Sequence, residues 1–420
     1  MKRSYSPNVT ELLSTKKPTR MLVCHHLPDD MVFHILRYLN FKFVLQTATL
    51  VSRQWAEQVM KVKLVIEDVK GIIIEPNVLH GITTSSQLVN LTRIDLSVKG
   101  LDDEGMKILS KSSNMFNVSE LCLTLNCLGS EGAGYIAQST YFSNLTLLNL
   151  SHNDIENYGV ESIASSSHMS KLTCLDLTNN HVKFRGAECI ANSSHVCNLT
   201  TLILNSNILK NNGVKSISNS EFLSNLTHLE LENAVFDYEG AIHIANSSHL
   251  VNLTRLNLGR NNISYRGAKS IAESPNMARL THLDLCYANI GNEGTKLIAE
   301  SPFMSHLVFL NVKKNSIDEN GVKYITQSVF MSHLTDLCLN INKIGNEGVK
   351  SIASSHIMSQ LTNLELFQNN IEDEGAKSIA NSVHLSRLKR LDLGDSRVGD
   401  EGARSIAQST FLIAKPTVSY

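Results

Sequence analysis

The amino-acid sequence predicts an α/β solenoid in which one short strand and one helix recur twelve times. The phrase L-T-x-L-x-L and its close variants begin at intervals of 27 residues, without one insertion or deletion. Within each copy, apolar residues first alternate and then recur at helical spacing. Because a unit of this size cannot bury its own apolar face, the copies must stack. The twelve copies begin at Leu91, Val118, Leu145, Leu172, Leu199, Leu226, Leu253, Leu280, Leu307, Leu334, Leu361 and Leu388.

The first half of each copy predicts a strand followed by a turn. Counting the first residue as position 1, positions 4 and 6 are Leu, Ile or Val in every copy, as at Leu148 and Leu150. Side chains alternate along a strand, so these positions point into the core, and positions 3, 5, 7 and 8 point to the concave side. Position 9 is Asn in eight copies. We expect its amide to bond to turn backbone and to the next copy.

The second half of each copy predicts a helix. Asp or Asn is frequent at position 13 and Glu at position 14, as in Asp373 and Glu374, which is N-cap and first-turn chemistry. Apolar residues at positions 16, 19 and 20 share one helix face. Position 15 is Gly and position 22 is Ser in all twelve copies. We expect the Gly to allow close backbone approach, and an apolar position 25 to lie under the return loop.

These residues resemble the leucine-rich repeat of the ribonuclease-inhibitor type, with a period slightly shorter than is usual for that type. The resemblance implies a horseshoe with strands on the concave side, helices outside, and a protein partner on the concave face. Residues 63–90 fit the frame loosely and are interpreted as an atypical capping repeat. The twelve repeats then occupy residues 91–414, and residues 415–420 form a tail without an obvious cap.

The variable concave positions are the candidate partner-binding residues. Arg, Tyr and Phe among them are typical interface anchors, although a solvated sheet face would also carry charged residues. The candidates are Glu230, Glu232, Arg255, Arg260, Asp284, Tyr287, Phe309, Lys313, Lys314, Asp336 and Phe367.

Residues 23–62 show a different, all-helical pattern that contains the single Trp of the chain. Pro28 followed by two acidic residues is a helix start signal. Apolar residues then share a helix face in two stretches: Met31, Ile35 and Leu39, followed by Val51, Trp55 and Val59. A helical unit of about 35 residues usually needs a partner or a neighbouring domain for stability. A helical cap on the solenoid is one interpretation of this segment.

The other interpretation is an F-box, because the opening Leu-Pro, the aliphatic helix and the final Val-x-x-x-Trp are similar to that motif. The resemblance implies binding to a Skp1-like adaptor and, through it, to a cullin-based ubiquitin ligase. The residues that it assigns to Skp1 binding are Leu27, Pro28, Met31, Ile35, Leu39, Val51 and Trp55.

An F-box followed by leucine-rich repeats matches a substrate-receptor architecture. The leading hypothesis is therefore a non-catalytic substrate-recognition subunit of an SCF-type (Skp1-cullin-F-box) E3 ubiquitin ligase. A scaffold or inhibitor without a ligase link is the alternative, and a small-GTPase regulator ranks last, since one such family has related repeats.

Composition and missing motifs limit the other classes of function. The net charge is −1, with +4 in residues 1–60 and −5 in the remainder, which predicts no nucleic-acid partner. No run of eighteen apolar residues is present, so no membrane partner is expected. Without a secretion signal, the chain is expected in the cytoplasm or nucleus, with reduced cysteines.

No catalytic or metal-binding motif occurs, so we expect no catalytic residues, no metal and no cofactor. Outside the ligase complex the chain is expected to be a monomer. Residues 1–22 predict a disordered basic tail, in which two basic pairs either form a bipartite nuclear localisation signal or are simply solvated.

Overall fold

The computed structural model describes residues 64–66, 79, 82–84, 90–412 and 417–419. The chain divides into two compact units, Met1–Val62 and Lys63–Tyr420. The predicted basic tail and the predicted F-box therefore lie outside the described residues. The domain boundaries given above remain predictions, and the following concerns the second unit alone.

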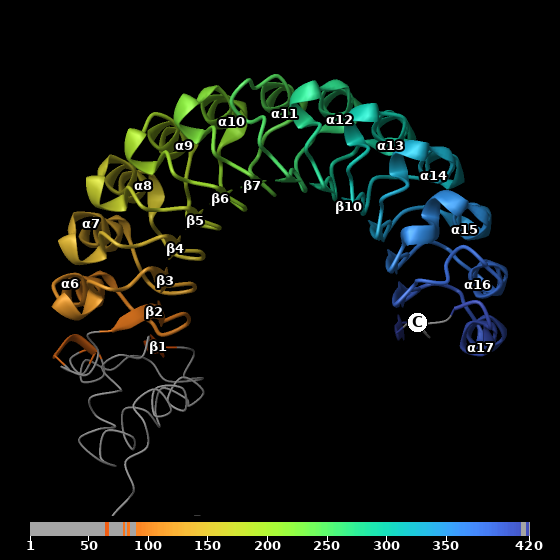
Figure 1. Cartoon of the computed structure of the whole chain (residues 1–420), viewed down its shortest axis with the longest axis horizontal. Helices are drawn as coiled ribbons and strands as arrows, with labels where there is room; N and C mark the ends of the chain where they lie inside the picture. The colour runs from red at the N-terminus through yellow and green to blue at the C-terminus, as the bar shows by residue number, and fades with distance from the viewer. Residues whose placement is uncertain (1–63, 67–78, 80–81, 85–89, 413–416, 420) are drawn as a thin grey trace, which may run out of the picture. The chain divides into compact units, whose positions relative to one another are not determined.

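The described strands form one parallel sheet in which each strand pairs with the strands before and after it in the sequence. Between β2 and β14 every pairing joins residues 27 apart, as in Leu148 with Leu175. The strands lie on the inner side of an arc (Figure 1). They are Leu64–Ile66 (β1), Leu91–Asp95 (β2), Glu120–Cys122 (β3), Leu147–Asn149 (β4), Cys174–Asp176 (β5), Thr201–Ile203 (β6), His228–Glu230 (β7), Arg255–Asn257 (β8), His282–Asp284 (β9), Phe309–Asn311 (β10), Asp336–Cys338 (β11), Asn363–Glu365 (β12), Arg390–Asp392 (β13) and Thr417–Ser419 (β14).

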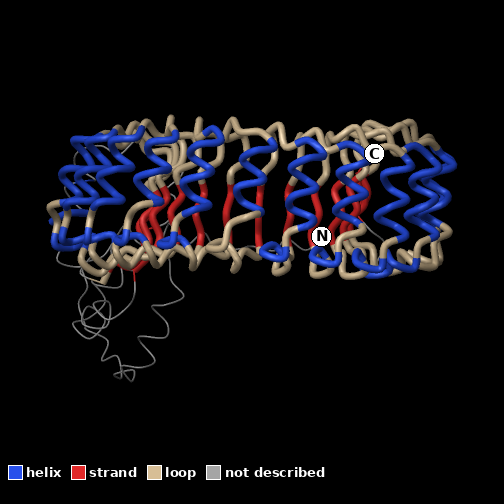
Figure 2. The backbone as a smooth tube through the Cα atoms, turned by 90° about the horizontal axis from the view of Figure 1, so that it is seen from above, coloured by secondary structure: helices blue, strands red, loops and turns tan. Residues whose placement is uncertain are grey.

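The α-helices form the outer layer of the arc, and each packs against the helices of the adjacent repeats (Figures 1 and 2). They are Asp103–Ser110 (α6), Ser130–Gln138 (α7), Glu156–Ser165 (α8), Phe184–Ala191 (α9), Lys210–Asn219 (α10), Tyr238–Ala245 (α11), Ser264–Glu273 (α12), Gly291–Ala299 (α13), Glu319–Gln327 (α14), Gly345–Ser354 (α15), Asp373–Ala380 (α16) and Asp400–Gln408 (α17). Most repeats return through a short 3-10 helix: Ser113–Met115 (η4), Thr140–Phe142 (η5), Ser167–Met169 (η6), Ser194–Val196 (η7), Glu221–Leu223 (η8), Pro275–Met277 (η9), Pro302–Met304 (η10), Val329–Met331 (η11) and His356–Gln360 (η12). This architecture confirms the predicted solenoid of one strand and one helix per repeat.

The core lies between the sheet and the helices, and the predicted positions fill it. Leu148 and Leu150 from the strand, Ile155 from position 11 and Met169 from position 25 are fully buried. Ile163 from the helix is 1% exposed. Truncation of one such buried aliphatic side chain to Ala costs about 2–5 kcal/mol.

The Asn at position 9 connects neighbouring repeats, but towards the preceding copy and not the next one. Asn207 Oδ1 accepts hydrogen bonds from the backbone N–H groups of Asn180 (3.1 Å) and Val182 (2.9 Å) in the repeat before it. Its Nδ2 donates to the carbonyls of Leu177 in that repeat and of Leu204 in its own. One buried side chain thus forms hydrogen bonds with backbone groups in two turns. These groups lie outside the strands and are not paired by the sheet.

Helix capping also differs from the prediction, because the N-cap lies at position 12 or 11 and not at position 13. Asp102 is such a cap, and its side chain accepts from the Gly105 N–H at 2.9 Å. Where position 13 is Asp or Asn and another repeat follows, its side chain caps the helix of that following repeat instead. Asn157 Oδ1 accepts from the N–H groups of Lys183 (2.9 Å) and Gly186 (3.0 Å), at the start of α9. Stacking places each position 13 beside the next helix terminus, where unpaired N–H groups need acceptors.

The constant Ser at position 22 connects each return loop to the last turn of the α-helix in the preceding repeat. Ser274 Oγ donates to the carbonyl of Ala245 in the preceding repeat at 2.6 Å and accepts from the Asn276 N–H, so it also caps η9. A second column of bonds runs along the start of the strands, where Thr173 Oγ1 donates to the Thr146 carbonyl at 3.1 Å. Both columns repeat at the same 27-residue register that the strands follow.

Both ends of the sheet extend beyond the twelve repeats. β1 pairs with β2 through an irregular register, as a degenerate first copy would. Residues 415–420, which the sequence indicates as a tail without an obvious cap, include β14, and β14 pairs with β13 at the same 27-residue interval. The backbone N–H and C=O groups of β13 thereby gain a partner strand. The sequence of the six-residue tail did not indicate this pairing.

We predict that removing a position-9 amide destabilises the solenoid. Asn207→Ala leaves buried N–H groups without an acceptor, so the free energy of unfolding should fall by about 2–4 kcal/mol. Urea unfolding followed by circular dichroism measures this change. Asn212→Ala on the exposed face of α10 is the matched control and should stay within about 0.5 kcal/mol. Equal effects of the two variants would contradict the role assigned to position 9.

We also predict opposite effects of two Gly→Ala substitutions in adjacent helices. At Gly159 an added Cβ would lie 2.5 Å from Ile155 Cγ2 and 3.2 Å from the Ser130 Cα, so Gly159→Ala should destabilise the fold. At Gly134 the nearest such atom is 3.9 Å away, so Gly134→Ala should stabilise α7 by up to about 1 kcal/mol. Thermal melting of both variants checks the two signs.

Candidate functional site

The concave face is built by strand positions 3 and 5 and by the turn at positions 7 and 8. Positions 4 and 6 are buried, so their neighbours face the inside of the arc. Position 8 has a left-handed backbone in all twelve repeats, with φ between 51° and 59°, although only Asn and Gly adopt this conformation readily. The turn in which the chain leaves the sheet therefore has the same conformation at position 8 in every repeat. As a result, the position-8 side chains line one edge of the concave face.

All eleven predicted concave residues lie in this surface, half-buried or exposed. Five belong to strands: Glu230, Arg255, Asp284, Phe309 and Asp336. Six follow the strands, in the turns: Glu232, Arg260, Tyr287, Lys313, Lys314 and Phe367. Their contact with a partner remains a prediction.

Four of them meet in one cluster that crosses four repeats. Arg260 Nε lies 2.9 Å from Glu232 Oε1, and the Arg260 guanidinium lies 4.4 Å from the centre of the Tyr287 ring. The Lys314 ammonium lies 5.3 Å from the same ring. The tyrosine is thus contacted by two cations, a geometry that holds an aromatic side chain in a defined orientation at the surface.

A second cluster occupies position 3, at the other end of the same strands. The rings of His282 and Phe309 stack with their centres 5.7 Å apart. Arg255 lies between His228 and His282 in the strand order. Burial lowers the pKa of both histidines, and the positive charge of Arg255 lowers it further. Sequence analysis did not single out His228 because an isolated histidine carries no motif.

Several predicted contact residues are already engaged within the sheet. Asp284 accepts from the Cys286 N–H at 2.8 Å and from Asn311 Nδ2 at 2.8 Å. Burial raises the pKa of Asp284, while these hydrogen bonds act in the opposite direction. Glu230 accepts from Asn205 Nδ2 at 2.8 Å. Such carboxylates primarily shape the turn and are less available to a partner than the lysines are.

The same arrangement identifies residues that sequence analysis missed. Asn205 also accepts from the Glu232 N–H at 2.7 Å, and Asn340 does the same for the Phe367 N–H five repeats later. The available signal was Asn at position 7, which these two repeats share. These asparagines orient the backbone that carries the predicted contact residues.

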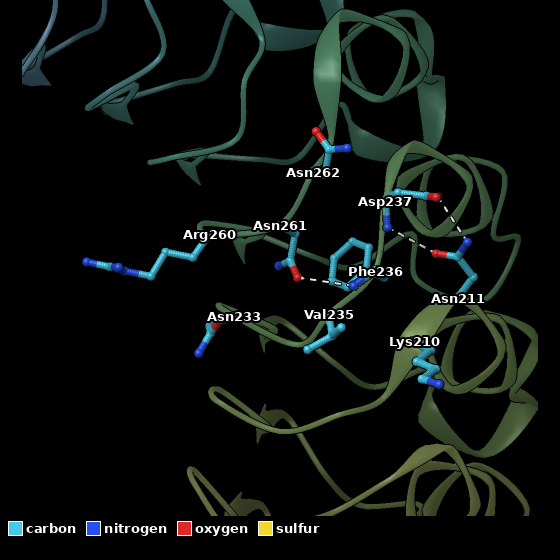
Figure 3. Close-up of a pocket in the computed structure, with 9 residues that line it drawn as sticks. All are labelled: Lys210, Asn211, Asn233, Val235, Phe236, Asp237, Arg260, Asn261 and Asn262. Atoms are coloured by element: carbon cyan, nitrogen blue, oxygen red, sulfur yellow. Dashed lines mark hydrogen bonds between the residues drawn. The ribbon is translucent and has the colours of Figure 1, made fainter.

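A shallow depression of about 490 Å³ opens beside β7, at the loops that follow the strands. Val235 lies within it, 55% exposed and with a φ of 62°. The Arg260 side chain extends away from the other lining residues (Figure 3). The depression is lined by Lys210, Asn211, Asn233, Val235, Phe236, Asp237, Arg260, Asn261 and Asn262. Sites for small molecules normally enclose their ligand, so this opening fits a protein surface better.

Metal and thiol chemistry find little support in the part of the chain that the structure describes. Within that part, no three His, Cys, Asp or Glu side chains gather as a metal site would require. The cysteines there are unpaired, and burial raises the pKa of Cys174 to about 11, so its thiol stays protonated at neutral pH. No helix among the described residues is long and apolar enough to span a membrane.

Comparison with known proteins identifies both parts of the chain. A leucine-rich-repeat family model matches residues 143–164, 168–191, 249–272, 279–299, 330–353, 359–380 and 384–407. An F-box domain model matches residues 24–67. No curated protein sequence matches the chain.

Solved structures match the chain at low sequence identity. An internalin from Listeria monocytogenes is 20% identical, covers 95% of this chain and 98% of its own, and has a TM-score of 0.53. A leucine-rich-repeat protein from Leptospira interrogans is 19% identical over 97% of this chain and 100% of its own, with a TM-score of 0.49. At this identity the first likeness shows the fold alone.

The solenoid and the repeat matches together define a leucine-rich-repeat protein. With the domain matched at its N-terminus, the chain is an F-box protein with C-terminal leucine-rich repeats. The predicted Skp1-binding residues, from Leu27 to Trp55, lie within the matched segment but outside the described residues.

We predict that the position-3 histidines make stability depend on pH. Their pKa values in the folded chain lie below the ordinary 6.5, so the unfolded chain binds more protons as the pH falls through that value. The melting temperature should therefore drop below about pH 6.5, and less so in the His228→Gln/His282→Gln variant. Melting at pH 7.5 and 5.5 measures the difference. His384→Gln on a return loop is the control, and an unchanged pH dependence of the double variant would contradict the prediction.

Proposed function

We propose that this protein is the substrate-recognition subunit of an SCF-type E3 ubiquitin ligase. The observation that carries the proposal is the order of its parts. An F-box domain match at residues 24–67 is followed by a repeat solenoid with an open concave face. The F-box supplies the link to a Skp1-like adaptor and a cullin, and the solenoid supplies a surface for a protein target.

On the ligase side, the proposed Skp1 contacts are apolar residues of the two predicted helical stretches, with Trp55 as the largest. A short helical unit with two apolar faces cannot bury both of them alone. Docking on an adaptor would cover the remaining face. The residues are Leu27, Pro28, Met31, Ile35, Leu39, Val51 and Trp55.

On the target side, the solenoid suits a receptor because its concave face is held rigidly. The columns of position-9 and position-22 hydrogen bonds connect each repeat to the one before it. A target bound on this face would keep a fixed orientation towards a separate transferring enzyme. Positioning of this kind accelerates a reaction without acid–base chemistry from the receptor itself. The chain is therefore proposed as a non-catalytic adaptor that acts in the cytoplasm or nucleus.

We predict that affinity purification of the tagged full-length chain from cells recovers a Skp1-like adaptor and a cullin. Leu27→Ala/Trp55→Ala should abolish that recovery, because it removes the opening and closing apolar contacts of the F-box. Phe116→Ala/Val329→Ala is the matched control, since it truncates two exposed apolar side chains of the solenoid, 54% and 66% exposed. The control should leave adaptor recovery unchanged.

Two results would contradict the proposal. If the F-box variant retains the adaptor, the assigned contacts are wrong. If the full-length chain recovers partners of the solenoid but neither adaptor nor cullin, the protein is a scaffold or inhibitor without a ligase link.

A further inference from the structure

Positions 7, 8 and 10 of the repeats form one edge of the concave face, which we call the rim. Basic side chains gather along one stretch of this rim. In the four repeats that begin at Leu253, Leu280, Leu307 and Leu334, the rim carries four cations and no carboxylate. They are Arg260, Lys313, Lys314 and Lys343, defined here as the basic rim. The six preceding repeats carry neither Lys nor Arg at the same positions. The charge is therefore local and does not reflect the composition of the repeat.

Within the basic rim, most of the positive charges are not paired with a carboxylate in the part of the protein that the structure describes. Arg260 pairs with Glu232 of the preceding repeat at 2.9 Å. The ion pairs formed among the described residues include none from Lys313, Lys314 or Lys343. Like charges in neighbouring repeats repel one another, and that repulsion is relieved when an anion binds between them.

Tyr287 lies at the centre of the basic rim. Its ring is contacted by Arg260 at 4.4 Å and by Lys314 at 5.3 Å, so cations from the repeats before and after it converge there. Tyrosine at such a point offers apolar area together with a hydroxyl, a combination enriched at protein interfaces. Ile341, the next position-8 residue after Lys314, adds a second apolar side chain to the same rim position.

We propose that the basic rim binds an acidic segment, rich in Asp and Glu, of the target protein. This proposal rests on the proposed function and names the chemistry of its target. Adjacent strands are about 4.8 Å apart, so four repeats span on the order of 15 Å, the length of four or five extended residues. Carboxylates of that segment pair with Lys313, Lys314 and Lys343, and its backbone or an apolar side chain packs on Tyr287.

Charge on the surrounding surface favours a short acidic peptide over nucleic acid. Glu232 lies at the rim one repeat before the basic rim, Asp395 lies at the rim two repeats after it, and residues 61–420 carry a net charge of −5. A polyphosphate longer than the four repeats would meet these carboxylates, whereas a few carboxylates fit within the cationic stretch.

Fluorescence anisotropy of a labelled poly-glutamate peptide with the full-length chain tests the proposal. The wild-type chain should bind this peptide, more weakly at higher salt, and should not bind a poly-glutamine peptide of equal length. Lys313→Glu/Lys314→Glu should weaken binding by about tenfold or more. Lys215→Glu/Lys323→Glu, on the exposed faces of α10 and α14, makes the same change in charge and should stay within about twofold of wild type.

Three outcomes would overturn the proposal: poly-glutamate is not bound, both double variants bind it equally, or a single-stranded oligonucleotide of similar charge binds more tightly. Circular dichroism melting of each variant shows that the fold is retained. Because the assay contains neither adaptor nor cullin, its result is independent of the ligase assignment. Loss of adaptor binding would overturn only the proposed function. Loss of peptide binding would overturn only the proposal that the basic rim binds an acidic segment.

Discussion

The parallel register of 27 residues is the constraint on which the rest of the solenoid depends. Most strands contain only three residues, too few to hold a sheet through strand hydrogen bonds alone. The register brings each position beside its counterpart in the next repeat, so side-chain hydrogen bonds also form columns. Asn207 pairs with backbone groups of two turns, and Ser274 joins its return loop to the end of helix α11 in the preceding repeat. An inserted residue would displace the positions that follow it within its repeat from their columns, and no insertion occurs between Leu91 and Ser409.

The exceptions at position 9 show how strongly the turn depends on these bonds. Where Ala234 replaces the Asn, its own carbonyl accepts from the N–H groups of Leu209 and Lys210. Beside Ala288, the Ile263 N–H donates to the Asn261 carbonyl at 2.9 Å. Ser396, which also replaces the Asn, has a buried hydroxyl without a partner among the described residues. Beside Ala234 and Ala288, the N–H group at position 11 of the preceding repeat is thus paired with a backbone carbonyl in place of the missing amide, because an unpaired buried group is costly.

Since core and turn positions carry the structural constraints, the concave positions remain free to differ between repeats. Only this freedom allows a repetitive protein to present a specific surface. In the middle of the arc the surface is organised by contacts between repeats: Glu232 orients Arg260, and Arg260 and Lys314 together orient Tyr287. A receptor needs such preorganisation, because side chains that are already oriented lose less entropy on binding.

The sequence by itself determined the period, the strand and helix of each repeat, the core positions and the two-part organisation. These follow from short-range patterns, such as the alternation at Leu148 and Leu150 and the helical spacing that includes Ile163. Only the tertiary structure decided which neighbour each polar side chain serves. The bonds of Asn207 to the preceding repeat, the cap that Asn157 provides for the following helix and the pairing of β14 all cross between repeats. Their direction depends on how the copies stack, and the pattern within a single copy contains no information about stacking. The same reason explains why the sequence placed Glu232, Arg260, Tyr287 and Lys314 on one face but could not show that they form one cluster.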